Sequence, residues 1–164
     1  LSLRRQRQMC IRDSPGGAHQ VGERPVLAWV AWESMTSVLF LCNTNRGKSQ
    51  IAAALALKHA PDWDIYSAGV QTTDEHVKQG INKEAKASLA KVGVEMSGTP
   101  TLVDPQIAAT VDHVVVVGDA DYDGPAQRWD IEDPSLRGLE GEERMDALRD
   151  DIDARVAEFV RAQR

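Results

Sequence analysis

The chain has 164 residues, 42% hydrophobic and 27% charged, an ordinary composition for one globular domain with a single core. Its formal net charge of −6 disfavours nucleic acid as a partner, because such binding neutralises phosphates with basic residues. The four histidines and two cysteines lack the spacing of metal ligands, so we expect no metal site. No apolar run approaches the ~20 residues that a membrane helix needs. So few cysteines fit a reducing, cytoplasmic setting.

The first 34 residues differ in pattern from the rest of the chain. They show no period of 2 or 3.6, and Ser-Pro-Gly-Gly follows their arginines where a signal peptide would have an apolar core. The segment QMCIRDS within them resembles translated sequencing-adapter read-through. We therefore expect residues 1–34 to be a non-native or disordered extension, and residues 35–164 to form one domain that begins at Met35.

From Met35 onward, short apolar segments alternate with helix-forming segments. In chain order we expect a strand over Ser37–Leu41, a helix over Ser49–Ala60, a strand over Asp64–Ser67, a helix over Asn82–Val92, a short helix over Asp104–Thr110, a strand over His113–Val117, an edge strand over Gln127–Ile131 and a long helix over Glu140–Arg161. Continuously apolar strands between helices predict an α/β fold whose parallel sheet is covered on both faces.

The most informative stretch is LFLCNTNRGKSQ, residues 39–50, where an apolar strand gives way to a polar loop and then to a helix. Ligands lie at the carboxyl ends of strands in such sheets, and Cys42 stands at the end of the first strand. The loop residues tolerate tight or left-handed conformations, so their N–H groups can surround an anion beside a helix N-terminus. The candidate oxyanion-binding residues are Asn43, Thr44, Asn45, Arg46, Gly47, Lys48 and Ser49.

The same electrostatic field favours the thiolate form of Cys42, which would make it a nucleophile. Ser49 can donate a hydrogen bond to the sulfur, and Lys48 supplies a fixed positive charge. Arg46 stands two residues before Lys48 and is most simply a side chain that faces solvent. A lone cysteine at a strand end can also be an inert core residue, but the polar, glycine-containing loop favours the nucleophile.

The pattern Cys-x-x-Asn-x-x-Lys-Ser resembles the phosphate-binding loop of the low-molecular-weight protein tyrosine phosphatase fold, which includes a class of arsenate reductases. Cys42, Asn45 and Ser49 match that loop, and Lys48 stands where the family usually has arginine. The ending Gly-Lys-Ser-Gln resembles the mycothiol-dependent arsenate reductases, or arsenate–mycothiol transferases. The resemblance implies a flavodoxin-like three-layer sandwich with a central parallel sheet of about four strands. It continues through YSAG, VDHVVVVGD, RWDIEDP and ERMDALRDDIDARV.

The resemblance also implies an enzyme of arsenate detoxification. Arsenate would bind in the Cys-x5-Lys loop and pass to mycothiol as co-substrate. A mycoredoxin-type, glutaredoxin-like protein would then reduce the arseno-mycothiol adduct to arsenite. The resemblance implies no bound cofactor, no nucleic-acid or membrane partner, and a monomer or homodimer.

Asp133, in the segment IEDP, matches by position the general acid that protonates the leaving oxygen in the resembled fold. Asp-Pro is also common in turns, and the adjacent Glu132 is an alternative acid. Ser135 and Leu136 follow, where phosphatases of this fold usually carry aromatic residues. Lysine also lacks the planar fork with which arginine grips two oxygens, so we expect weak phosphatase activity. The candidate catalytic residues are Cys42, Lys48 and Asp133.

No cysteine follows Cys42 in the sequence. A thioredoxin-coupled reductase resolves its first cysteine with further cysteines of its own chain, so here the resolving thiol comes from outside unless Cys10 can reach. Two other functions stay open: a low-molecular-weight phosphatase for phosphotyrosine or small phosphate esters, and a non-catalytic anion-binding domain. The acidic run over residues 119–123 is interpreted as a polar loop on the side of Cys42, where it can contact a substrate.

Overall fold

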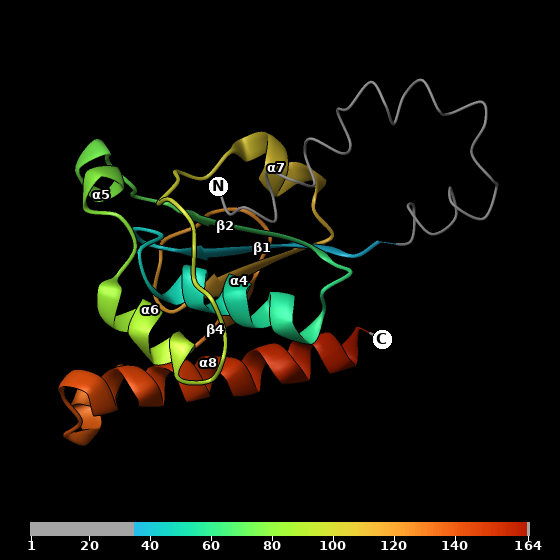
Figure 1. Cartoon of the computed structure of the whole chain (residues 1–164). Coiled ribbons are helices and arrows are strands. Elements are labelled where there is room, and N and C mark those ends of the chain that lie inside the picture. Colours follow the sequence, from blue (N-terminus) through green and yellow to red (C-terminus); the bar gives the residue numbers. More distant parts are fainter. Residues whose placement is uncertain (1–34, 164) are drawn as a thin grey trace.

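The structure, a computed structural model, describes residues 35–163 (Figure 1). The hypothesis about residues 1–34 lies outside the described residues. Four parallel strands form the central sheet in the order β2-β1-β3-β4, which confirms the predicted sheet. The strands are β1 (Ser37–Cys42), β2 (Asp64–Gly69), β3 (His113–Val117) and β4 (Gln127–Trp129).

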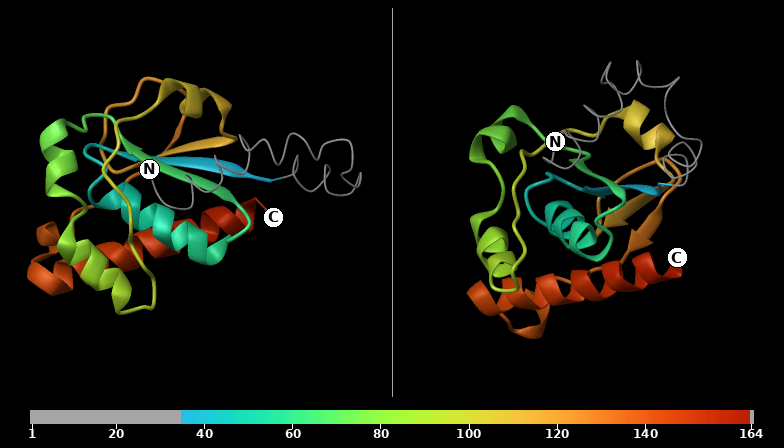
Figure 2. Two further views of the ribbon diagram at one scale, coloured as in Figure 1. Left: turned by 45° about the horizontal axis from the view of Figure 1, so that its top comes forward. Right: turned by 45° about the vertical axis from the view of Figure 1, so that its right-hand side comes forward.

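Helices cover both faces of the sheet, so the three-layer, flavodoxin-like arrangement is confirmed (Figure 2). One face carries α4, α6 and the long α8, and the opposite face carries the short α7. Two further elements, α5 and a 3-10 helix η2, were not predicted from the sequence. The bounds are α4 (Lys48–His59), α5 (Asp74–Gln79), α6 (Lys83–Ala90), α7 (Pro105–Thr110), η2 (Pro134–Arg137) and α8 (Gly141–Ala162).

The side chains of β1 divide between the two faces because successive residues of a strand point in opposite directions. Val38 and Phe40 enter the larger core beneath α4 and α8. Leu39 and Leu41 enter the smaller core on the α7 side. All six residues of β1 are buried, so this strand is the centre of both cores and holds the start of the next loop in place.

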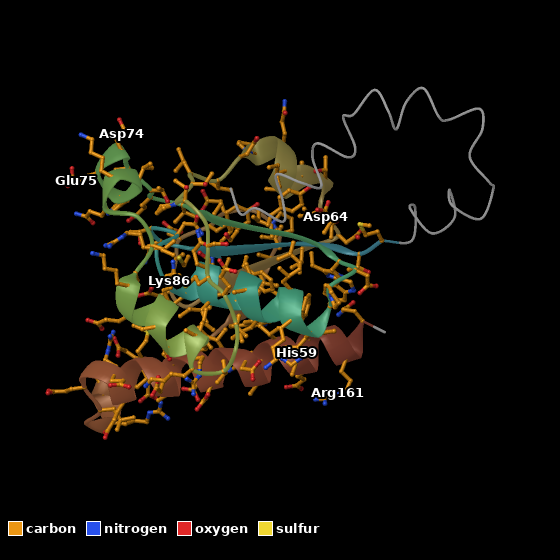
Figure 3. All side chains as sticks on the ribbon, viewed as in Figure 1. His59, Asp64, Asp74, Glu75, Lys86 and Arg161 are labelled. Atoms are coloured by element: carbon orange, nitrogen blue, oxygen red, sulfur yellow. The ribbon has the colours of Figure 1, made fainter. Side chains whose placement is uncertain are left out.

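The helices begin where the sequence offers capping residues. Asn82 accepts hydrogen bonds from Glu84 N and Ala85 N at the start of α6, and Asp104 caps α7 in front of a proline. His59, the last residue of α4, lies on the side of that helix next to α8 (Figure 3). Its Nε2 lies 2.7 Å from a carboxylate oxygen of Asp153 on α8.

The apolar stripe predicted along α8 faces the core. The helix buries Met145, Leu148, Ile152, Val156, Phe159 and Val160. Within residues 35–163, none of the helices is both long and apolar enough to span a membrane.

Replacing Ile152 tests this packing. Ile152 is fully buried in the larger core, so Ile152→Ala should lower the free energy of unfolding by about 2–5 kcal/mol, measured by urea denaturation. Leu136, whose exposure is 77%, is the control, and Leu136→Ala should change that free energy by no more than about 0.5 kcal/mol. Equal effects of the two variants would contradict the assignment of α8 to the core.

Candidate active site

A pocket of about 270 Å³ opens at the carboxyl end of β1. Its lining includes Cys42 and the loop that follows, together with Val117 and Asp119 at the end of β3. Asn82, just before α6, and the start of α8 complete the wall. β1 pairs with β2 on one side and with β3 on the other, so the chain leaves this edge in opposite directions and a crevice results.

Cys42 lines this pocket, and 6% of the residue is exposed. The backbone N–H of Asn45 donates to the sulfur at 3.2 Å, and the Ser49 hydroxyl lies 2.9 Å from it. A thiolate carries no proton, so in that state the Ser49 hydroxyl is the donor. Two donors directed at one sulfur stabilise its negative charge.

Asn45 fixes the direction of these hydrogen bonds. The backbone N–H of Thr101, which can only donate, bonds to Asn45 Oδ1 at 2.9 Å, and Gln50 Nε2 bonds to the same oxygen at 3.2 Å. Asn45 Nδ2 therefore points the other way and donates to Ser49 Oγ at 2.7 Å. Because Ser49 Oγ accepts from Asn45, its own proton stays available to a thiolate at Cys42.

The backbone of Asn45 adopts a left-handed conformation with φ of 59°, the only positive φ of a non-glycine residue among the described residues. Asparagine tolerates this region better than most residues. Asn45 and Ser49 are both fully buried, so they lie beneath the loop and support it instead of lining the pocket. The Asn45 backbone N–H and the Ser49 hydroxyl hold Cys42, and the loop above them lines the pocket.

The other predicted loop residues line the pocket: Asn43, Thr44, Arg46, Gly47 and Lys48. The interpretation of Arg46 as a solvent-facing side chain is wrong. It is half-buried, and its Nε donates to the carbonyl of Gly80 at 2.7 Å. Asn43 Nδ2 lies 3.4 Å from Asp119 Oδ1, so the acidic loop after β3 reaches the site, as the sequence suggested.

Two sources of positive potential meet at the loop. Gly47 precedes α4 and has no side chain to cap the helix, so the first N–H groups of α4 receive no side-chain cap. Lys48 begins the helix, and its Nζ lies 3.1 Å from the position that a β-carbon on Gly118 would occupy. A larger residue at position 118 would displace this ammonium, so the glycine leaves the space that Lys48 occupies.

Asp133 lies beyond the pocket lining and is connected to the pocket through Arg144. Arg144 Nε and Nη2 each donate to one oxygen of the Asp133 carboxylate at 2.8 Å. The backbone N–H of Ser135 donates to the same carboxylate at 2.9 Å. The Arg144 guanidinium, together with that N–H, holds the pKa of Asp133 well below its usual range. Asp133 is therefore ionised in this arrangement, and its role as a general acid stays a prediction.

Sequence reasoning missed several residues of the site. Gln50 and Thr101 hold Asn45, while Asn82 and Arg144 line the pocket. Gln50 ends the Gly-Lys-Ser-Gln motif and Arg144 lies in ERMDALRDDIDARV, but the sequence reasoning gave neither a role in the site. Asn82 and Thr101 lie on separate segments of the chain, and no local pattern assigns them to the site. In residues 35–163, no cluster of three or more His, Cys, Asp or Glu side chains is arranged to hold a metal ion.

Comparison with known proteins places this geometry in context. Residues 37–124 match the family model described as low molecular weight phosphotyrosine protein phosphatase. The chain is 30% identical over 140 residues to an arsenate reductase of Bacillus licheniformis, a similarity that covers 77% of this chain and 96% of the relative.

Solved structures show the same similarity. An arsenate reductase from Archaeoglobus fulgidus is 30% identical, with a TM-score of 0.58, and the match covers 75% of this chain and 98% of that one. A thioredoxin-dependent arsenate reductase from Corynebacterium glutamicum is 27% identical with a TM-score of 0.61. That match covers 78% of this chain, which spans 61% of the Corynebacterium chain.

Removing the Asn45 side chain should slow alkylation of Cys42. In Asn45→Ala the Ser49 hydroxyl loses the hydrogen bond from Asn45 and the left-handed backbone is strained, so the two donors at the Cys42 sulfur are less well oriented. We expect the rate constant with iodoacetamide at pH 7 to fall about tenfold, the effect of one hydrogen bond to a charged group. Peptide mass spectrometry reads the modification at Cys42, with Cys10 as the reference thiol in the same sample. An unchanged rate at Cys42 would contradict this role of Asn45.

The Asp133–Arg144 pair should make stability depend on pH. A lowered pKa in the folded state means that the bridge stabilises the fold above about pH 4, the pKa of an unfolded aspartate, and that this contribution is lost as the pH falls below it. Asp133→Asn should therefore lower the free energy of unfolding by about 1 kcal/mol at pH 7, because the side chain is 41% exposed and solvent screens the pair.

At pH 3 the same substitution should lower the free energy of unfolding by less than it does at pH 7. Asp151→Asn is the control, because Asp151 makes a single 3.1 Å contact with Arg137 in an exposed pair. Denaturant unfolding at the two pH values measures the difference. If Asp133→Asn lowers the free energy of unfolding equally at both pH values, the salt bridge between Asp133 and Arg144 does not stabilise the fold.

Proposed function

The chain belongs to the low molecular weight phosphotyrosine protein phosphatase family, and we propose that its reaction is the reduction of arsenate with a thiol supplied by another molecule. The relatives from Bacillus licheniformis and Archaeoglobus fulgidus, both named arsenate reductases, support this choice within the family. The supporting feature of the site is a cysteine sulfur held by two donors at a pocket whose wall carries an ammonium group.

Arsenate binds in the loop from Cys42 to Lys48 in the proposed reaction. The uncapped N–H groups at the start of α4 and the Lys48 ammonium attract the anion. Ser49 and the N–H of Asn45 contact the Cys42 sulfur and fix its position before the anion arrives. Preorganised donors of this kind need no rearrangement during the reaction.

The chemical step exchanges one arsenate oxygen for sulfur. A thiolate forms the sulfur–arsenic bond, and the departing oxygen takes up protons and leaves as water, while arsenic keeps its oxidation state. Asp133 is the proposed proton donor, which requires that it first leave Arg144. Whether Cys42 itself bonds to arsenic or activates the bound arsenate for an outside thiol, its thiolate is required.

The second thiol comes from outside the chain in this proposal. No cysteine stands between residues 43 and 164, whereas resolution within one chain needs a second cysteine that can reach the first. Mycothiol takes the arsenic as an arseno-mycothiol adduct, and its sulfur displaces either water from the bound arsenate or, where Cys42 is bonded to arsenic, the Cys42 thiolate. A mycoredoxin-type thiolate then attacks the mycothiol sulfur, and the electron pair of the sulfur–arsenic bond stays on arsenic. The products are arsenite and a mixed disulfide, and a reducing cytoplasm suits this chemistry.

Hydrolysis of phosphate esters is the second candidate, favoured by the family model and by the same anion loop. Two features of the site argue against a phosphotyrosine substrate. Lys48 offers a point charge where a planar fork would orient a phosphoryl transition state. Leu136, 77% exposed after the Asp-Pro segment, stands where aromatic residues would flank the substrate ring.

A coupled assay with the full chain tests the proposed reaction. It contains arsenate, mycothiol, mycoredoxin and an NADPH-linked recycling system, with p-nitrophenyl phosphate hydrolysis measured in parallel. We expect NADPH consumption that requires mycothiol and that Cys42→Ser abolishes. Cys10→Ser is the matched control and should retain turnover, because the relay does not use a second cysteine of this chain.

The other outcomes assign the protein differently. Phosphate release that depends on Cys42, without arsenate turnover, would make it a phosphatase. Turnover with thioredoxin in place of mycothiol, lost in Cys10→Ser, would overturn the external thiol. If neither arsenate turnover nor phosphate release is observed, the protein is a non-catalytic anion-binding domain.

A further inference from the structure

Arg144 is the residue of α8 that adds a basic side chain to the lining of the Cys42 pocket. It lies near the start of α8 and lines the same cavity as Cys42 and Lys48. Met145 and Leu148 on the same helix also line this cavity, and both are buried in the larger core. The packing of α8 therefore determines where Arg144 stands.

The fork of Arg144 is held by a carboxylate in this structure. Its Nε and Nη2 donate to the two oxygens of Asp133. Two parallel N–H groups of a guanidinium fit a pair of oxygens on a carboxylate, and they fit a pair of oxygens on a tetrahedral oxyanion equally well. The same edge of the guanidinium cannot hold both, so an oxyanion that reaches this edge has to displace Asp133.

The other basic side chains of the pocket are bound differently. Lys48 provides charge but no fork. Arg46 donates its Nε to a neutral carbonyl, that of Gly80, so no negative charge competes for it there. Among the described residues that line the pocket, Arg144 is the one whose fork is paired with a carboxylate. An anion in the pocket can therefore compete with Asp133 for the Arg144 guanidinium.

We propose that Arg144 is a second oxyanion-binding residue of this site, delivered by α8, and that the incoming oxyanion competes with Asp133 for its guanidinium. The inference rests on the proposed function only in that the site binds an oxyanion. Transfer of Arg144 to the anion also frees Asp133. The carboxylate whose pKa Arg144 holds low then returns towards its ordinary acidity, as a proton donor requires.

The test measures how well arsenate protects Cys42 from iodoacetamide, so no turnover is needed. The full chain is alkylated at neutral pH with increasing arsenate and without any other thiol, and peptide mass spectrometry reads the modification at Cys42. The half-protecting arsenate concentration is compared for the wild type, Arg144→Gln, Asp133→Asn and the double variant. Thermal unfolding verifies that each variant is folded.

Arg137→Gln is the matched control. Arg137 pairs with Asp151 at 3.1 Å and so joins η2 to α8, as the Asp133–Arg144 pair does, but it does not line the pocket. Its substitution should change the half-protecting concentration by no more than about twofold.

Competition predicts opposite effects for the two partners of the bridge. Arg144→Gln should raise the half-protecting arsenate concentration about tenfold, as expected for the loss of hydrogen bonds between charged groups. Asp133→Asn should lower it about fivefold, because the competing carboxylate is gone. In the Arg144→Gln background the same change at Asp133 should have less than about a twofold effect, because no guanidinium remains to be released.

Three results would overturn the inference. If Arg144→Gln leaves protection unchanged, Arg144 does not bind the anion. If Asp133→Asn weakens protection, or strengthens it equally in both backgrounds, the two groups do not compete for one fork. If arsenate does not protect the wild type at all, the oxyanion site itself is absent and the proposed function fails with it. In the first two cases the proposed function stands, because arsenate still protects the wild type.

Discussion

The position of β1 between β2 and β3 is the constraint on which the site depends. Parallel pairing on both sides buries every residue of this strand and fixes the point at which Cys42 leaves the sheet. Because the connections turn to opposite sides from there, the loop after β1 meets the end of β3, α6 and α8 in one crevice. The position of Cys42 in this crevice is therefore a consequence of strand order.

Next to β1, Asn45 links the loop backbone to the Cys42 sulfur. Its left-handed conformation turns the N–H toward Cys42, and its amide, oriented by the Thr101 N–H, directs Ser49 to the same atom. These hydrogen bonds are part of the fold, so the donors around the Cys42 sulfur are placed during folding.

The sequence predicted the fold well because its strands and main helices carry strong apolar patterns. Elements without such a pattern were missed: α5 buries none of its residues, and η2 is a single 3-10 turn after Asp133. The loop was also identifiable, since its residues are adjacent in the chain. Arg144 was not, because it meets the pocket only once α8 has packed, and Arg46 was misassigned because its partner Gly80 lies 34 residues away.

A lysine at the end of the anion loop changes how the site divides its tasks. One arginine would supply both charge and a fork, whereas here the charge of Lys48 lies over Gly118 and the fork of Arg144 stands on another helix. A fork on α8 is paired with Asp133, so in the proposed site anion binding and proton donation are coupled through a single guanidinium. An arginine in place of Lys48 would carry charge and fork together, and its contact with the anion would not involve Asp133. In the proposed site Lys48 supplies only charge, and the fork that holds the anion is the one that also pairs with Asp133.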